Sequence, residues 1–125
     1  MAEEQEKVIH SYRDLFVWQE AVDLVVECYR LTETFPKTET YDLVSQIRRS
    51  ATAVPANIAE GHGRDHLGDY LRHISIAKGS LTELETHLII AERLSYLSKE
   101  DLSRVLKRSA EIGRMLEGLS RSLRK

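Results

Sequence analysis

Two long stretches of the sequence carry apolar residues in alternating steps of three and four, and this spacing constrains the fold most strongly. The first stretch begins at Leu67 and the second at Leu102. Such steps keep the side chains on one face of an α-helix, whereas a half-buried strand would need steps of two. The two stripes are Leu67, Tyr70, Ile74, Ala77, Leu81, Leu84, Leu88 and Ala91, and Leu102, Val105, Ser109, Ile112, Leu116, Leu119 and Leu123. They predict two helices that pack nearly antiparallel.

Two further stripes with the same spacing precede these. They consist of Leu15, Trp18, Val22, Val25 and Tyr29, and of Val44, Ile47, Ala51, Val54 and Ile58. Short connections separate the four segments, and short connections favour antiparallel neighbours. We therefore predict an all-α fold, an antiparallel up-and-down four-helix bundle that forms a single domain over residues 13–125. Residues 1–12 lack a periodic apolar pattern, and we expect them to form a loose N-terminal tail.

The breaks between the segments have local causes. Gly61 and Gly63 are expected to end the second helix, and Asp65 is a candidate cap for the third. Ser98, followed three residues later by Asp101, is close to a capping box before the fourth helix.

Pro55 lies inside the second periodic segment. It cannot donate a hydrogen bond to the carbonyl of Ala51, and a proline in an isolated helix interior costs about 3 kcal/mol. Small residues surround it in the sequence, so another backbone can approach a bent helix closely. We predict a kink in the second helix near Pro55, and a break into two helices is the alternative.

Composition narrows the class of protein. With 125 residues, 42% of them hydrophobic and 30% charged, the chain suits one helical globular domain. Cys28 is the one cysteine, which excludes an internal disulfide and cysteine-rich zinc patterns and favours a reducing, cytoplasmic location. No apolar run approaches the roughly 18 residues that a membrane span needs, so we expect no membrane association.

Catalytic and metal-binding patterns are weak. His62 and His66 have the spacing of a ligand pair, but glycines and an expected loop surround them. Glu83 and His87 share a helical face, yet the Glu-x-x-His spacing of di-iron bundles is absent. A phosphate-binding glycine loop, a nucleophile elbow and a catalytic triad are absent too. We therefore expect no enzymatic activity, no cofactor and no bound metal.

Charge is distributed unevenly, although the formal net charge is only -2. Residues 1–40 hold nine acidic groups against four basic ones, whereas residues 98–125 hold eight basic groups against four acidic ones. In the last helix Lys107, Arg114 and Arg121 recur every seven residues, farthest from the apolar seam. The asymmetry reflects either pairing between neighbouring helices or contact with a polyanion, and the outward stripe is either a solvated face or a set of phosphate contacts. The stripe lacks interleaved aromatic residues, so base stacking is not indicated there.

Two adjacent arginines in the second helix allow the same two interpretations. Arg48 falls beside the seam, and Arg49 points away from it. They form salt bridges to the acidic first helix or to a neighbouring subunit, or they contact phosphate.

The first helix is apolar on more than one side. An isolated four-helix bundle has no use for so wide an apolar surface. We therefore expect its second stripe to form the interface of a homo-oligomer. This stripe consists of Val17, Ala21, Leu24, Cys28 and Leu31.

Three segments of the chain carry a family resemblance. They read DLFVWQEA over residues 14–21, SQIRRSATAVPANIAEGHGR over residues 45–64 and GSLTELETHL over residues 79–88. Over about residues 12–120 the chain resembles the four helix bundle protein family, also called the 23S rRNA intervening-sequence proteins. Some members of that family are encoded within insertions of the large ribosomal RNA gene, and relatives act as accessory factors to reverse transcriptases. The family has no established catalytic residues, so none are carried over.

The resemblance implies a bacterial cytoplasmic protein, an antiparallel four-helix bundle and a ring-shaped homopentamer. In such a ring each outward basic stripe is repeated, and weak phosphate contacts become an avid surface. We predict electrostatic binding of RNA or DNA, without reading of base sequence, through Arg48, Arg49, Arg64, Lys107, Arg114 and Arg121. The alternative is a scaffold or adaptor that binds a protein partner and has no nucleic-acid role.

Overall fold

Every regular element of residues 8–125, the part of the chain that the computed structural model describes, is helical. The four long helices are α2 (Phe16–Thr32), α3 (Leu43–His62), α4 (Leu67–Arg93) and α5 (Lys99–Arg124). Two 3-10 turns, η1 (Tyr12–Asp14) and η2 (Lys37–Glu39), precede α2 and α3. The predicted all-α class and the four predicted helices are confirmed.

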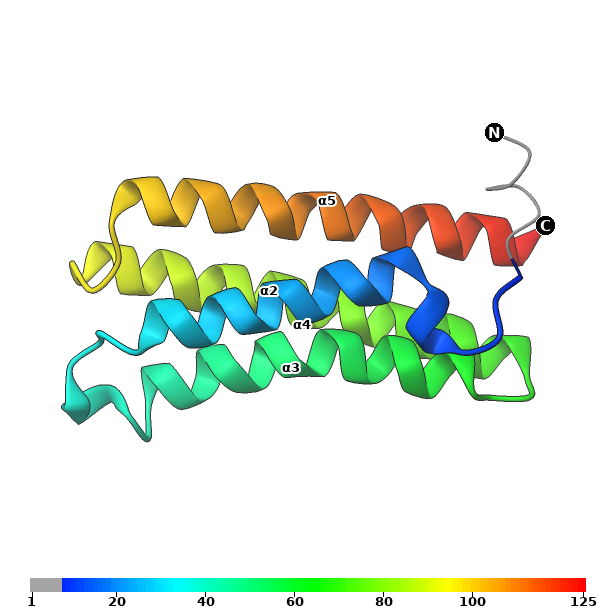
Figure 1. Ribbon diagram of the computed structural model, residues 1–125, viewed down its shortest axis with the longest axis horizontal. Coiled ribbons are helices and arrows are strands. Elements are labelled where there is room, and N and C mark those ends of the chain that lie inside the picture. Colours follow the sequence, from blue (N-terminus) through cyan, green and yellow to red (C-terminus); the bar gives the residue numbers. More distant parts are fainter. Residues whose placement is uncertain (1–7) are drawn as a thin grey trace.

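The long helices lie side by side as a bundle (Figure 1). α2 contacts α3 and α5, and α4 contacts the same two helices, so each helix has two neighbours. Figure 1 shows the α2–α3 and α4–α5 connections at one end of the bundle and the α3–α4 connection at the other. Because the four helices form a closed ring of neighbours, each turns one face toward a shared interior.

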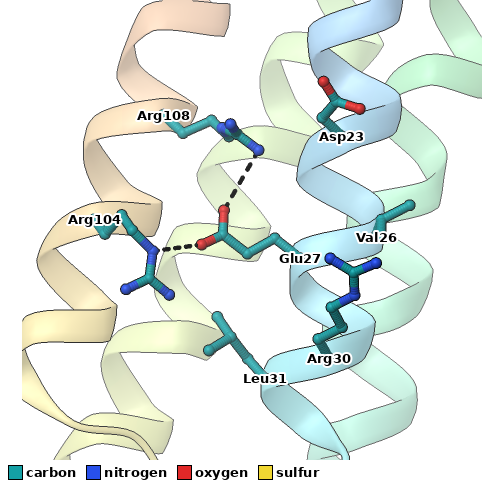
Figure 2. Close-up of a pocket in the computed structure, with 7 residues that line it drawn as sticks. All are labelled: Asp23, Val26, Glu27, Arg30, Leu31, Arg104 and Arg108. Atoms are coloured by element: carbon teal, nitrogen blue, oxygen red, sulfur yellow. Dashed lines mark hydrogen bonds and ion pairs between the residues drawn. The ribbon is translucent and has the colours of Figure 1, made fainter.

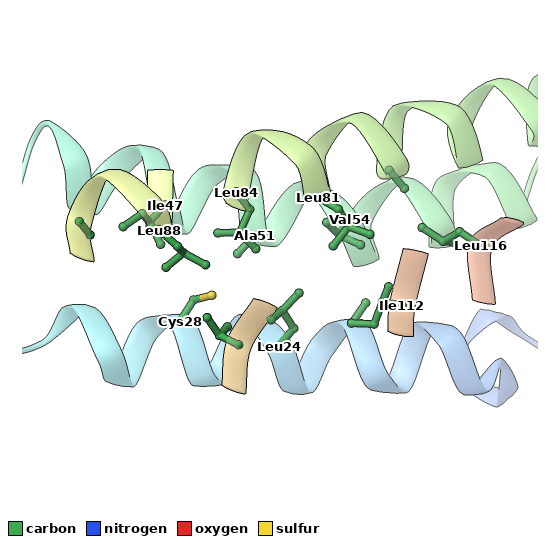
Figure 3. Packing of buried hydrophobic residues seen from close by; sticks show 14 of the residues in the cluster. Leu24, Cys28, Ile47, Ala51, Val54, Leu81, Leu84, Leu88, Ile112 and Leu116 are labelled. Atoms are coloured by element: carbon green, nitrogen blue, oxygen red, sulfur yellow. The ribbon is translucent and has the colours of Figure 1, made fainter. Parts of the chain in front are cut away.

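The core fills this interior with one stripe of side chains from each helix (Figure 3). In α3, α4 and α5 most of the buried apolar residues come from the predicted stripes, as with Ile47, Leu84 and Leu116, but Leu67 of the predicted α4 stripe is exposed. Burial of such a side chain contributes about 1.5–3 kcal/mol relative to leaving it in water. The largest side chains with almost no exposure are Leu24, Ile47, Ile58, Ile74, Leu84, Leu88, Ile112 and Leu116.

The inward face of α2 differs from the predicted one. Val17, Ala21, Leu24 and Cys28 are buried in the core of a single chain, and Leu31 is half-buried against it. The prediction that this stripe forms a subunit interface is therefore wrong, because packing within one chain already covers it.

The stripe predicted as the α2 seam lies instead toward the outside. Its two aromatic rings have partners there: the Trp18 ring meets the Tyr12 ring edge-on at 5.1 Å, and the Tyr29 ring lies 4.4 Å from the Arg48 guanidinium. Both stripes are apolar and keep helical spacing, so periodicity alone could not rank them. The small residues Ala21 and Cys28 occur on the stripe that packs inward.

Cys28 behaves as a core residue. Burial raises the pKa of its thiol to about 12, and the neighbouring Glu27 carboxylate adds to the rise. Because only the thiolate is nucleophilic, the protonated thiol at neutral pH acts as a small apolar group.

Helix α3 continues through Pro55 without interruption, and Pro55 itself is buried. The alternative of a break into two helices is therefore wrong. A kink at this position stays a prediction.

The helix ends agree in part with expectation. Gly63 ends α3, and the Ser98 hydroxyl caps α5 by accepting a hydrogen bond from the Asp101 N–H at 3.0 Å. His66, rather than Asp65, precedes the first residue of α4, and its side chain forms no cap.

A capped 3-10 turn, η1, precedes the first long helix. Ser11 caps η1 by accepting from the Arg13 N–H, and the Asp14 carboxylate accepts from the Ser11 N–H. Residues 1–7 of the predicted tail lie outside the described residues.

Gly61 marks a close approach of α3 to α4. A Cβ at this position would lie 2.7 Å from the Cβ of His73, whereas a Cβ at Gly79 would meet nothing within 4 Å. Gly61→Ala should lower the free energy of unfolding by about 1–3 kcal/mol, because the helices must move apart. Gly79→Ala, the matched control, should raise it by about 0.5–1 kcal/mol through its better helix propensity. Urea unfolding measures both changes, and an equal effect of the two substitutions would contradict the close approach.

Candidate nucleic-acid interface

The six predicted phosphate contacts do not converge on one surface. Arg48 and Arg49 lie on α3 and Arg64 lies just after it, whereas the other three residues lie along α5. These three are Lys107, Arg114 and Arg121.

The α5 residues form an exposed basic stripe. Lys107, Arg114 and Arg121 are all exposed, and neither Lys107 nor Arg114 forms an ion pair within the described part of the chain. The exposed Glu111 lies between them in the sequence, so the stripe is predominantly rather than purely basic. Unpaired cations on a helix face are free to contact phosphates.

Glu117 offsets part of the charge at the end of this stripe. Its carboxylate accepts a hydrogen bond from the Lys78 ammonium of α4. Lys78 lowers the pKa of Glu117, and Arg121 and Arg124 lower it further. Glu117 therefore stays ionised, and its negative charge offsets part of the positive charge of Lys78 on α4 and of Arg121 and Arg124 on α5.

Arg48 is engaged inside the chain. Its Nε donates to the Thr32 hydroxyl at 2.9 Å, its Nη2 donates to the Tyr29 carbonyl at 3.3 Å, and its guanidinium stacks on the Tyr29 ring. The expected contact with the first helix thus exists, but it is made to neutral groups rather than to acidic ones. Sequence reasoning missed this role because nothing in the pattern marks Thr32 as the partner.

The other two central arginines differ. Arg64 pairs with Glu60 of the preceding turn, with Nη2 at 2.6 Å from Oε2, and both side chains are about half exposed. Such surface pairs contribute at most about 1 kcal/mol and open readily. Arg49 is exposed and has no ion pair among residues 8–125.

A charged groove of about 540 Å³ separates α2 from α5 (Figure 2). The Glu27 side chain, 17% exposed, lies between two arginines of α5: Arg104 Nε donates to Oε2 at 2.7 Å, and Arg108 Nη1 lies 3.6 Å from Oε1. The lining residues are Asp23, Val26, Glu27, Arg30, Leu31, Arg104 and Arg108.

This groove explains part of the charge asymmetry. The hydrogen bond to Glu27, followed by that to Asp101, raises the pKa of Arg104. Arg104 and Arg108 of the basic α5 thus pair with acidic groups, as one of the two interpretations expected. The stripe farther from α2 remains available for other partners.

A second groove, of about 370 Å³, is almost entirely apolar. It runs between α2 and α3, with valines of α2 on one wall and small residues of α3 opposite. Its lining residues are Tyr12, Trp18, Val22, Val25, Val26, Thr52, Pro55, Ala56 and Ala59.

Within residues 8–125, no three His, Cys, Asp or Glu side chains come together to hold a metal ion. The His62 ring instead packs edge-on against Tyr70 at 5.8 Å. None of the described helices combines the length and apolarity that crossing a membrane requires.

The fold of this chain is shared with a protein of known structure. A crystal structure of a protein of unknown function from the S23 ribosomal protein family of Bacteroides thetaiotaomicron VPI-5482 superposes with a TM-score of 0.78. The two sequences are 24% identical, and the match covers 84% of this chain and 95% of that one, so it supports the fold alone. No curated protein matches the chain.

The family follows from the sequence itself. The family model described as 23S rRNA-intervening sequence protein matches residues 13–118, so the chain belongs to this family. The resemblance found in the sequence is confirmed.

The adjacent arginines of α3 allow a matched test of the Arg48 contacts. Arg48→Ala should lower the free energy of unfolding by about 1–2 kcal/mol, because it removes two hydrogen bonds and the stacking on Tyr29. Arg49→Ala should change it by less than about 0.5 kcal/mol, because Arg49 is exposed and unpaired. Chemical denaturation followed by circular dichroism compares the two, and equal stabilities would show that Arg48 does not tie α3 to α2.

Proposed function

We propose that this protein is a non-enzymatic homo-oligomer that binds RNA or DNA electrostatically through repeated basic surfaces. The exposed α5 stripe carries the proposal, because Lys107 and Arg114 have no ionic partner of their own in the described part of the chain. Contacts of this kind neutralise phosphates and release counterions without reading bases. The family description, which refers to an intervening sequence of 23S rRNA, agrees with a nucleic-acid role.

The apolar α2–α3 groove supports self-association. Contiguous apolar side chains such as those of Trp18, Val22 and Val25 are unfavourable in contact with water, and a surface of this kind often marks a protein interface. Ile76 and Ile90 of α4, and Leu94 just after its last residue, are exposed and share one helical side. A groove on one face and exposed apolar side chains on another allow a head-to-tail contact between copies, and such contacts form rings when the rotation between copies closes.

The number of copies comes from the family resemblance, which implies five. In a ring each copy adds one α5 stripe, so individually weak phosphate contacts act together. A scaffold that binds a partner protein through the same apolar groove is the second candidate, favoured by the groove's apolar lining.

The proposal includes finer features of the bundle and its location. Short connections support an antiparallel up-and-down order. The missing N–H of Pro55 and its small neighbours support a bend in α3. The single cysteine supports a reducing cytoplasm.

Charge reversal tests nucleic-acid binding. The triple variant Lys107→Glu, Arg114→Glu and Arg121→Glu should lose affinity for structured RNA and for duplex DNA in a filter-binding titration at low salt. For any residual duplex binding, the slope of log K against log salt should become shallower by about 3.

The control variant is Arg72→Glu, Arg93→Glu and Lys99→Glu, which changes the net charge by the same amount at exposed positions outside the stripe. It should retain most of the affinity. If both triple variants lose binding equally, net charge rather than the stripe is responsible. Wild-type protein that binds neither nucleic acid at low salt would leave the scaffold as the better candidate.

A single substitution in the groove tests self-association. Ala56 is exposed on the groove, so Ala56→Glu should leave the monomer fold intact and reduce the mass measured by light scattering toward 14.4 kDa. Ala110→Glu, at an exposed position of α5, should leave the mass of the assembly unchanged. A wild-type mass of one chain at micromolar concentration would overturn the homo-oligomer.

A further inference from the structure

A third cavity, of about 380 Å³, lies where α2 ends and α3 begins. Two tyrosines and two arginines surround it, together with three hydroxyl side chains. The lining residues are Tyr29, Thr40, Tyr41, Val44, Ser45, Arg48, Arg49 and Thr52. Its volume lies within the range of about 300–1,000 Å³ that is typical of ligand sites.

Tyr41 is the most unusual residue of this cavity. It lies on the connection that leads into α3, and it is 95% exposed, the highest value among the exposed large hydrophobic residues of the described chain. Exposure of an aromatic ring to water is unfavourable, and the exposed ring of Tyr41 offers a flat apolar face to a planar partner.

Tyr29 and Arg48 form a second flat surface in the same cavity. The Arg48 guanidinium lies 4.4 Å from the centroid of the Tyr29 ring, and hydrogen bonds to the Thr32 hydroxyl and the Tyr29 carbonyl hold it there. A guanidinium fixed in this way is an ordered platform, and nucleobases stack on guanidinium planes as well as on aromatic rings. Little side-chain entropy is then lost when a base binds.

The residues that line the cavity carry positive charge only. No acidic side chain is among its lining residues, in contrast to the α2–α5 groove. Of the acidic residues closest in sequence, Glu39 accepts hydrogen bonds from the Leu43 N–H and the Tyr96 hydroxyl, and Asp42 accepts one from Gln46. Arg49 is exposed, forms no ion pair among residues 8–125, and lines the same cavity as Tyr41.

Resting on the nucleic-acid function proposed above, we infer that this cavity binds an unpaired nucleotide of an RNA or DNA strand. The base stacks on Tyr41 and reaches the Tyr29–Arg48 platform, and the phosphate contacts Arg49. The Ser45 side chain lines the same cavity and is available to a base edge or a sugar hydroxyl.

The combination of groups selects for single strands. In a duplex the base faces are stacked on one another and cannot reach an aromatic ring, whereas an unpaired base exposes its face. The α5 stripe offers charge alone and does not distinguish the two forms. The protein thus combines a surface for any phosphate backbone with a pocket for an unpaired base.

Single substitutions test the pocket with two probes, a labelled oligouridine and an RNA duplex of the same length, in fluorescence anisotropy titrations. Tyr41→Ala should weaken oligouridine binding at least about fivefold, the loss expected for one stacked base, and leave duplex binding unchanged. Tyr41→Phe keeps the ring and should retain the affinity for oligouridine. Phe16→Ala removes another exposed ring, outside this cavity, and should affect neither probe.

Different outcomes separate failure of the pocket from failure of the proposed function. If the wild type binds both probes and loss of the α5 stripe abolishes binding while Tyr41→Ala changes nothing, only the pocket is overturned. If the wild type binds neither probe at low salt, both proposals fall. If Tyr41→Ala changes the mass of the assembly, a second copy covers the ring and the nucleotide pocket is overturned.

Discussion

The packing of α2 against α3 and α5 decides which surfaces the protein exposes. Leu24 and its neighbours on the same stripe enter the core, and this choice turns the second apolar stripe outward. The outer stripe then forms a wall of the apolar α2–α3 groove and, at Tyr29, of the aromatic cavity. On the opposite side of α2, Glu27 forms ion pairs with Arg104 and Arg108 of α5. Three surfaces thus follow from one rotational setting of one helix.

The same setting divides the arginines by role. Arg104 and Arg108 form ion pairs with the largely buried Glu27. Arg48 donates hydrogen bonds to the Thr32 hydroxyl and the Tyr29 carbonyl near the end of α2. These contacts hold helices together, and the ion pairs with Glu27 engage two cations that a polyanion could otherwise use. Exposed cations without an ion pair remain on the outer side of α5 and at Arg49, at different places on the bundle. A formal net charge of -2 therefore hides separate positive surfaces on the folded chain.

Much of the fold could be predicted because helical spacing is a local property. Helices α3, α4 and α5 each have one main apolar face. Periodicity therefore identified buried residues such as Ile47, Leu84 and Ile112 without knowledge of their neighbours. Helix α2 has two apolar faces, and the choice between them depends on how closely the other helices approach. That information is tertiary, so the sequence misassigned the buried face as an interface.

The candidate site was predictable to a lesser extent for the same reason. The seven-residue spacing places Lys107, Arg114 and Arg121 on one side of α5, and the structure leaves all three exposed. The aromatic cavity joins Tyr29, Tyr41 and Arg49, whose spacing matches no helical repeat because a turn lies between them. Base stacking was not indicated along the α5 stripe, and the rings that could provide it lie at the end of another helix pair. A nucleic-acid strand bound by this protein would therefore have to extend from α5 to the α2–α3 connection, or contact these surfaces on different copies of a ring. In the second case one strand would link neighbouring subunits, and binding would depend on assembly even though no residue of the pocket comes from another copy.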